Sequence, residues 1–116
     1  MEAADLRLGL CTVPDRDTGM RMARALVSER LAACVNVVGG VTSVYRWQGE
    51  LASNDEVLLI IKTSRQVNED KLKDRILTLH PYDVPELLLL PVQYGLNKYI
   101  DWIAQSVSDV VTEPEL

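Results

Sequence analysis

Residues 57–63 are Val-Leu-Leu-Ile-Ile-Lys-Thr, an apolar run of strand length that is hydrophobic at both odd and even positions. A strand with one face in water alternates apolar and polar residues, whereas a strand covered on both faces is apolar throughout. The run therefore predicts a central strand. We expect helices on one of its faces and a cover that another subunit could provide on the other.

Two helices and a strand are predicted on the C-terminal side of this run. Leu72, Ile76 and Leu79 lie at i, i+4 and i+7, which indicates an amphipathic helix that ends before His80 and Pro81. The Leu-rich segment 86–92 is typical of a short strand. Apolar residues recur at helical spacing in the last predicted helix, at Leu96, Ile100, Ile103 and Val107. The tail from Thr112 is expected to fray.

A hairpin and a long Val-rich segment are predicted on the N-terminal side. Gln48 and Gly49 form a two-residue turn candidate, since glycine tolerates the positive φ that such turns need. The segment 32–47 carries Gly39 and Gly40 in its middle. It is either two tightly joined strands or one strand bent at a glycine bulge.

The chain opens with a predicted strand and helix. Residues 6–13 form a strand that stops at Pro14. A helix from Asp17 follows, capped by Asp15 or Asp17. Its apolar stripe is expected at Met20, Ala23, Leu26, Val27 and Leu31, with Arg21, Arg24 and Glu29 facing outward.

The order of these elements predicts an α+β fold of the ferredoxin-like, split βαβ type with an extra C-terminal helix. We expect one domain over residues 1–116, with an ordered core at about 6–107. In this topology the third strand separates the first from the second, so Cys11 and Cys34 are too far apart for a disulfide. Both cysteines are predicted to be free thiols.

Charge and composition exclude several classes of protein. A net charge of −5 without a basic run argues against nucleic-acid binding. No apolar run approaches the roughly 18 residues of a membrane span, and the first residues do not resemble a signal peptide, so a cytoplasmic location is expected. No catalytic triad, phosphate loop or paired acids of suitable spacing occur, so the chain is predicted not to be an enzyme.

The segment 80–86, His-Pro-Tyr-Asp-Val-Pro-Glu, is the main candidate for a site. Its two prolines stiffen a loop that holds an imidazole, a phenol and two carboxylates, which suits a ligand site and also suits a plain helix-to-strand connection. His80, Cys11 and a carboxylate such as Glu86 could together hold a borderline or soft divalent cation. The structural alternative is that His80 caps the preceding helix and Cys11 packs in the core.

Aromatic residues beside the predicted hairpin suggest a contact surface. Tyr45 and Trp47 flank the turn, where a lone small domain has little to bury an indole. Trp47 is expected either at a subunit interface or against the last helix, near Tyr99 and Trp102.

Six motifs in order resemble the signatures of the CutA family over about residues 8–104. They are Leu10-Cys11-Thr12-Val13-Pro14-Asp15, Glu29-Arg30-Leu31-Ala32-Ala33-Cys34-Val35-Asn36, Ser43-Val44-Tyr45-Arg46-Trp47-Gln48-Gly49-Glu50, Ile60-Ile61-Lys62-Thr63, His80-Pro81-Tyr82-Asp83-Val84-Pro85-Glu86 and Tyr99-Ile100-Asp101-Trp102-Ile103. The resemblance implies a ferredoxin-like homotrimer, with the hairpin at Trp47 and the last helix at subunit contacts. It also implies likeness to the trimeric PII signal proteins.

The resemblance implies three hypotheses about function. The first is a divalent-cation tolerance protein that binds Cu(II) or a similar ion through Cys11 and His80, although Leu79 stands where some members have a second histidine. The second is a PII-like sensor whose inter-subunit cleft binds a small metabolite. The third is a trimeric interaction scaffold. Residues expected at the cleft or interface are Tyr45, Trp47, Glu50, Lys62, Tyr82, Glu86 and Trp102.

Overall fold

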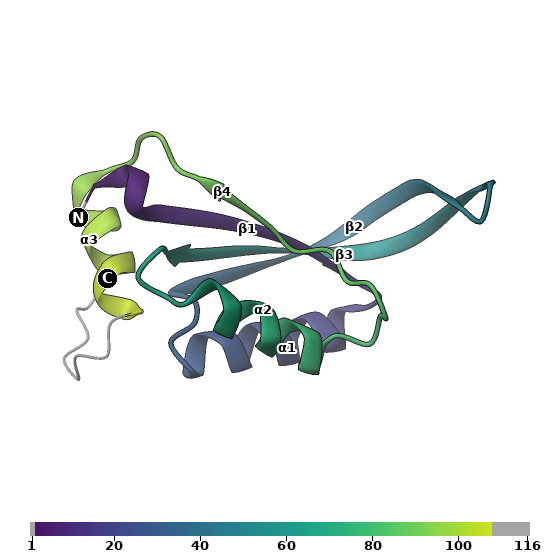
Figure 1. Ribbon diagram of the computed structural model, residues 1–116, viewed down its shortest axis with the longest axis horizontal. Helices are drawn as coiled ribbons and strands as arrows, with labels where there is room; N and C mark the ends of the chain where they lie inside the picture. The colour runs from purple at the N-terminus through teal and green to yellow at the C-terminus, as the bar shows by residue number, and fades with distance from the viewer. Residues whose placement is uncertain (1, 108–116) are drawn as a thin grey trace.

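The computed structural model describes residues 2–107, and the tail from Thr112 lies outside that range. A short 3-10 turn at Ala3–Asp5 precedes the main elements. These are β1 (Leu6–Val13), α1 (Arg16–Ser28), β2 (Cys34–Trp47), β3 (Glu50–Ser64), α2 (Glu69–Leu79), β4 (Leu88–Pro91) and α3 (Asn97–Ser106). The order confirms the predicted ferredoxin-like fold with an added C-terminal helix (Figure 1).

The four strands form one antiparallel sheet in the order β2-β3-β1-β4. β3 is therefore a central strand, as the apolar run 57–63 predicted. β3 also separates β1 from β2. Cys11 lies opposite Leu59 and Cys34 opposite Lys62, and both cysteines are free.

The helices α1 and α2 cover the same face of the sheet (Figure 1). The core lies between them and that face, where the sheet contributes alternate residues such as Cys11, Leu59 and Ile61. α3 packs at one end of the sheet and adds Ile100 and Ile103 to the core. No helix of the described part of the chain is long and apolar enough to cross a membrane.

The buried stripe of α1 differs from the prediction. Met22 and Leu26 are fully buried, whereas Met20 is only half-buried and Val27 is 41% exposed. The helix begins at Arg16, with Asp15 as its cap, and it directs the residues around Met22 toward the sheet. Leu31 is buried as expected, although it lies beyond the helix end.

The long segment before the hairpin is a single strand. β2 and β3 pair along their length with a register shift between Val38 and Val41, so the bent-strand alternative is correct. Gln48 and Gly49 form the turn, with φ values of 50° and 81°. β3 is longer than predicted, because its first half pairs with β2 to build an arm that projects from the domain (Figure 1).

The ends of β4 and α2 depend on their surroundings. β4 covers only Leu88–Pro91, which is shorter than the predicted 86–92, since only four residues pair with β1. α2 ends at Leu79, as predicted.

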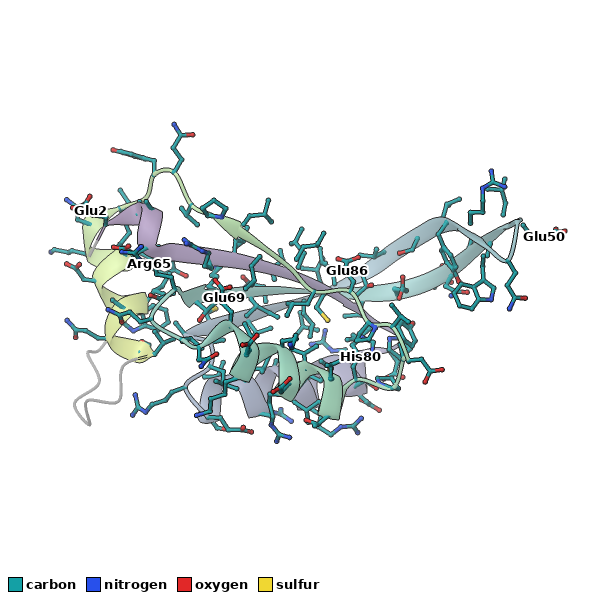
Figure 2. All side chains as sticks on the ribbon, in the orientation of Figure 1. Glu2, Glu50, Arg65, Glu69, His80 and Glu86 are labelled. Atoms are coloured by element: carbon teal, nitrogen blue, oxygen red, sulfur yellow. The ribbon has the colours of Figure 1, made fainter. Side chains whose placement is uncertain are left out.

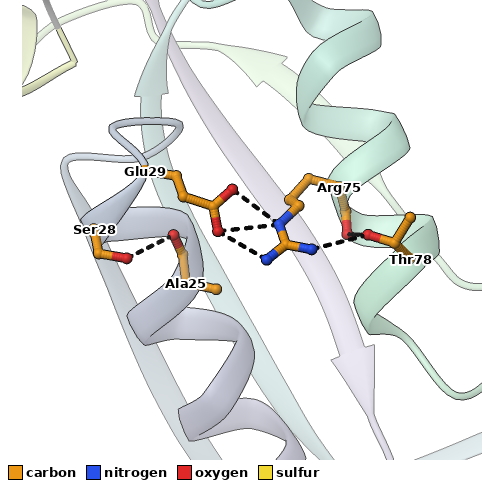
Figure 3. Close-up of polar contacts among 5 residues, drawn as sticks. All are labelled: Ala25, Ser28, Glu29, Arg75 and Thr78. Carbon is orange, nitrogen blue, oxygen red and sulfur yellow. Dashed lines mark hydrogen bonds and ion pairs between the residues drawn. The ribbon is translucent and has the colours of Figure 1, made fainter.

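An ion pair joins α2 to the end of α1. The Arg75 Nε lies 2.9 Å from Glu29 Oε1, and the Arg75 Nη2 lies 2.9 Å from Glu29 Oε2 (Figure 3).

Candidate functional site

His80 links the end of α2 to the end of β1. Its backbone N–H donates to the Ile76 carbonyl, which closes the last turn of α2, and its side chain is only 6% exposed. The Tyr82 backbone N–H donates to Nδ1 over 3.1 Å, so Nδ1 carries no proton in this contact. Nε2 therefore holds the proton and donates to the Thr12 carbonyl at 2.7 Å. Both ring nitrogens are used within the chain.

Cys11 lies on the helix-covered face of β1 with no exposed surface. Burial raises the pKa of its thiol to about 12, and the negative charges of Glu86 and Glu56 add to the effect. Its Sγ makes only a weak 3.9 Å contact to the Thr12 carbonyl. The thiol is thus protonated at neutral pH, and it is a core side chain of low reactivity.

Tyr82 and Glu56 form a polar contact beside His80. The Tyr82 hydroxyl donates to Glu56 Oε2 at 3.0 Å, and the Tyr82 ring lies 4.7 Å from the His80 ring. Burial raises the pKa of Tyr82 to about 12, and both the hydrogen bond to Glu56 and the charge of that carboxylate act in the same direction. The phenol remains a donor, which satisfies a carboxylate that is only 8% exposed.

Both candidate copper ligands are engaged within the chain. A metal needs the thiolate form of cysteine and a free imidazole lone pair. The Cys11 thiol is protonated, and the His80 Nδ1 lone pair accepts the Tyr82 N–H. Across residues 2–107, no group of three His, Cys, Asp or Glu side chains could hold a metal ion. The sequence also lacks a second histidine at position 79.

The residues predicted for a metabolite cleft are spread along one chain. Glu50 lies at the tip of the β2–β3 arm, whereas His80 and Glu86 lie near its base (Figure 2). Lys62 is near the opposite end of β3 from Glu50, with its Nζ 5.6 Å from the centre of the Tyr99 ring. The structure therefore brings Tyr82 close to His80 but does not bring Glu50 to Lys62 within a single subunit.

The aromatic residues predicted at the interface also lie in different parts of the chain. Trp47 is 61% exposed near the tip of the arm, so the alternative in which it packs against the last helix is wrong. Tyr45 is 37% exposed, and its hydroxyl accepts a hydrogen bond from Asn54. Trp102 stacks on Tyr99 in α3, with the ring centres 5.6 Å apart.

The face of the sheet opposite α1 and α2 is apolar and lies outside the core. The register places Leu8 beside Leu90 and Leu10 beside both Ile60 and Leu88. Side chains directly opposite in an antiparallel pair share a face. Six apolar residues of this helix-free face are half-buried or exposed, and none belongs to the buried core: Leu8, Leu10, Leu58, Ile60, Leu88 and Leu90.

Sequence reasoning missed Glu56, which the structure places at the centre of the candidate site. It is a buried carboxylate with Tyr82 as its donor. Its position directly before the apolar run 57–63 could have indicated a buried carboxylate, because an acid at the start of a buried strand segment needs a hydrogen-bond or charge partner.

Comparison with known proteins gives consistent matches. The family described as CutA1 divalent ion tolerance protein matches residues 8–106. The Divalent-cation tolerance protein CutA of Thermus thermophilus is 50% identical over 97 residues, which cover 84% of this chain and 93% of that protein. The chloroplastic Protein CutA of Arabidopsis thaliana is 47% identical over 95 residues, and the match covers 82% of this chain and 52% of that longer protein. The crystal structure of CutA from Xylella fastidiosa has a TM-score of 0.86 at 38% identity, with 90% of this chain and 99% of that chain covered.

Proposed function

The chain belongs to the CutA1 divalent ion tolerance protein family, and from this premise we propose that it acts as a non-enzymatic homotrimer assembled through the helix-free face of its sheet. The apolar helix-free face carries this proposal. Antiparallel sheets with one face in water are polar on that face, whereas here Leu10, Ile60 and Leu88 leave a continuous apolar surface. Such a surface on a soluble domain indicates a protein contact.

The projecting arm supports the same assembly. Val44, Trp47 and Leu51 are 70%, 61% and 76% exposed near its tip, where nothing in residues 2–107 covers them. Aromatic and large apolar side chains are enriched at the centres of subunit contacts. The arm reaches beyond the compact part of the domain, so its apolar tip is available to a neighbouring subunit.

The chemistry of the candidate site supports a non-enzymatic role. A catalytic cysteine must be partly accessible and form a thiolate, and a general base needs a free lone pair. Cys11 is buried and protonated, and both His80 nitrogens are hydrogen-bonded to backbone groups. We infer that this site holds the 80–86 loop against β1 and β3.

We propose that copper does not bind at Cys11 and His80, because it would have to displace the Tyr82 N–H from Nδ1 and reach a thiol with no exposed surface. Calorimetric titration with CuSO4 tests the point. We expect Cys11→Ser and His80→Ala to leave the copper affinity of the folded protein unchanged. A tenfold or greater loss of affinity in both folded variants would restore the metal hypothesis for this site.

Light scattering during gel filtration tests the assembly. The wild-type chain should have about three times the 13.0 kDa mass of one subunit. Leu88→Glu places a carboxylate on the apolar helix-free face and should shift the mass toward the monomer. The matched control is Val27→Glu on α1, which starts from a comparably exposed apolar residue and should keep the wild-type mass. A monomeric wild type, or a trimeric Leu88→Glu protein, would contradict the proposal.

A further inference from the structure

A groove runs between α2 and the segment 83–89, on the helix-covered side of the sheet. Its volume is about 540 Å3. This is within the size range of clefts that take small ligands or a few large side chains. Leu77 and Val84 are 49% and 83% exposed beside it. The apolar lining consists of Ile76, Leu77, Val84, Pro85, Leu87 and Leu89.

The rim of this groove is acidic. It carries Glu69, Asp70 and Asp83 and a single cation, Lys73. Lys73 lies 3.6 Å from Asp70, so that charge is already paired. Within residues 2–107, the carboxylates of Glu69 and Asp83 have no ion-pair or hydrogen-bond partner. Glu69 is the first residue of α2 and is labelled in Figure 2.

The groove is separate from the proposed subunit contact. Leu89 lies opposite Gly9 on the helix-covered side, whereas Leu88 and Leu90 lie on the helix-free face. Successive residues of a strand point to opposite faces. Binding in the groove therefore does not depend on the trimer. Assembly through the helix-free face would leave α2, on the opposite face of the sheet, accessible.

We propose that this groove binds a short cationic amphipathic segment of another protein, with apolar side chains on Leu77 and Val84 and Lys or Arg beside Glu69 and Asp83. An apolar floor with a charged rim of one sign is the arrangement that recognises such a segment. Residues 108–116 carry three acids and no Lys or Arg, so their charge does not complement the acidic rim. The acidic rim favours a basic partner.

Fluorescence anisotropy on the full-length protein tests this proposal. The probe is a fluorescein-labelled peptide of leucine and lysine with leucine at helical spacing, and the control peptide has glutamate in place of lysine. We expect the lysine peptide alone to bind, with an affinity that falls as NaCl is raised. Asp83→Lys and Leu77→Gln should each weaken binding by about 3- to 10-fold.

Two matched variants separate the groove from the general acidity of the protein. Asp17→Lys reverses an exposed acid on α1, and Val27→Gln removes an exposed apolar residue there. Both should bind the peptide as the wild type does. The proposal is overturned if Asp17→Lys weakens binding as much as Asp83→Lys, or if Leu77→Gln has no effect. It is also overturned if Leu77→Gln lowers the oligomeric mass, because the groove would then be a contact between copies.

Discussion

The thiol of Cys11 should remain protonated far above neutral pH, and this can be tested residue by residue. Its pKa is raised from 9.0 to about 12 by burial and by the charges of Glu86 and Glu56. Three pKa units correspond to about a thousandfold smaller thiolate fraction at pH 8. Iodoacetamide reacts only with the thiolate, so Cys11 should be alkylated at least about a thousandfold more slowly than an unperturbed cysteine.

The same protein unfolded in urea provides the control, because Cys34 lies beside Lys62 on the helix-free face that the proposed assembly would cover. Timed alkylation of the native protein at pH 8, followed by peptide mass spectrometry, measures both cysteines together. We expect Cys11 to stay unmodified in the folded protein and to be alkylated once the protein is unfolded in urea. Equal alkylation rates of Cys11 in the folded and the urea-unfolded protein would refute the assignment of Cys11 as a buried, protonated side chain.

The same raised pKa predicts how stability depends on pH. Below pH 9, both the folded and unfolded states keep the proton of Cys11. Between pH 9 and 12 the unfolded state loses it first, so the unfolding free energy falls with a limiting slope of about 1.4 kcal/mol per pH unit. From pH 9 to 11, wild type should lose about 2 kcal/mol more than Cys11→Ala, measured by urea unfolding at one fixed protein concentration. Identical pH profiles for the two proteins would contradict this mechanism.

Two further predictions concern packing and the contact between helices. Glu29→Gln and Arg75→Gln should show a coupling energy of about 0.5–1 kcal/mol in a double-mutant cycle of urea unfolding, because the ion pair is bidentate but partly exposed. This coupling energy should decrease at high NaCl concentration. Additive effects of the two substitutions would contradict the prediction. Gly9→Ala should lower the unfolding free energy by about 1–3 kcal/mol, since its Cβ would lie 3.1 Å from side-chain atoms of two neighbours, whereas Gly39→Ala, with no atom within 4 Å, should be nearly neutral in the same assay.

The order of the elements was predictable because each depends on a local pattern. The turn at Gln48–Gly49, the end of α2 at Leu79 and the central place of 57–63 all follow from short stretches of sequence, and the structure confirms them. The length of the β2–β3 arm was not predictable in this way. Its pairing depends on the register of two strands, and residues 50–56 are too polar to signal a strand on their own.

The candidate site was predictable only as a set of residue types. The sequence contains one histidine and a cysteine in an apolar strand, which is compatible with a metal site and with a structural role. The hydrogen bonds favour the structural role, and they depend on tertiary contacts: Thr12 is 68 positions from His80, and Glu56 is 26 positions from Tyr82. No local pattern encodes the donation of the Tyr82 N–H to the imidazole, which removes the lone pair that a metal would use.

The two faces of the sheet differ in their surroundings, and this difference explains both the apolar run 57–63 and the burial of Cys11. Alternate residues of β1 and β3 face the helices, and there Cys11 and Leu59 are fully buried. The intervening residues, such as Leu10 and Ile60, are as hydrophobic but lie outside the core of the single chain. A sheet that is apolar on both faces is what the proposed assembly requires, because a single subunit covers only one of them. Cys11 is already fully buried on the helix-covered face of the single chain, so the protonation of its thiol does not depend on an assembly through the opposite face.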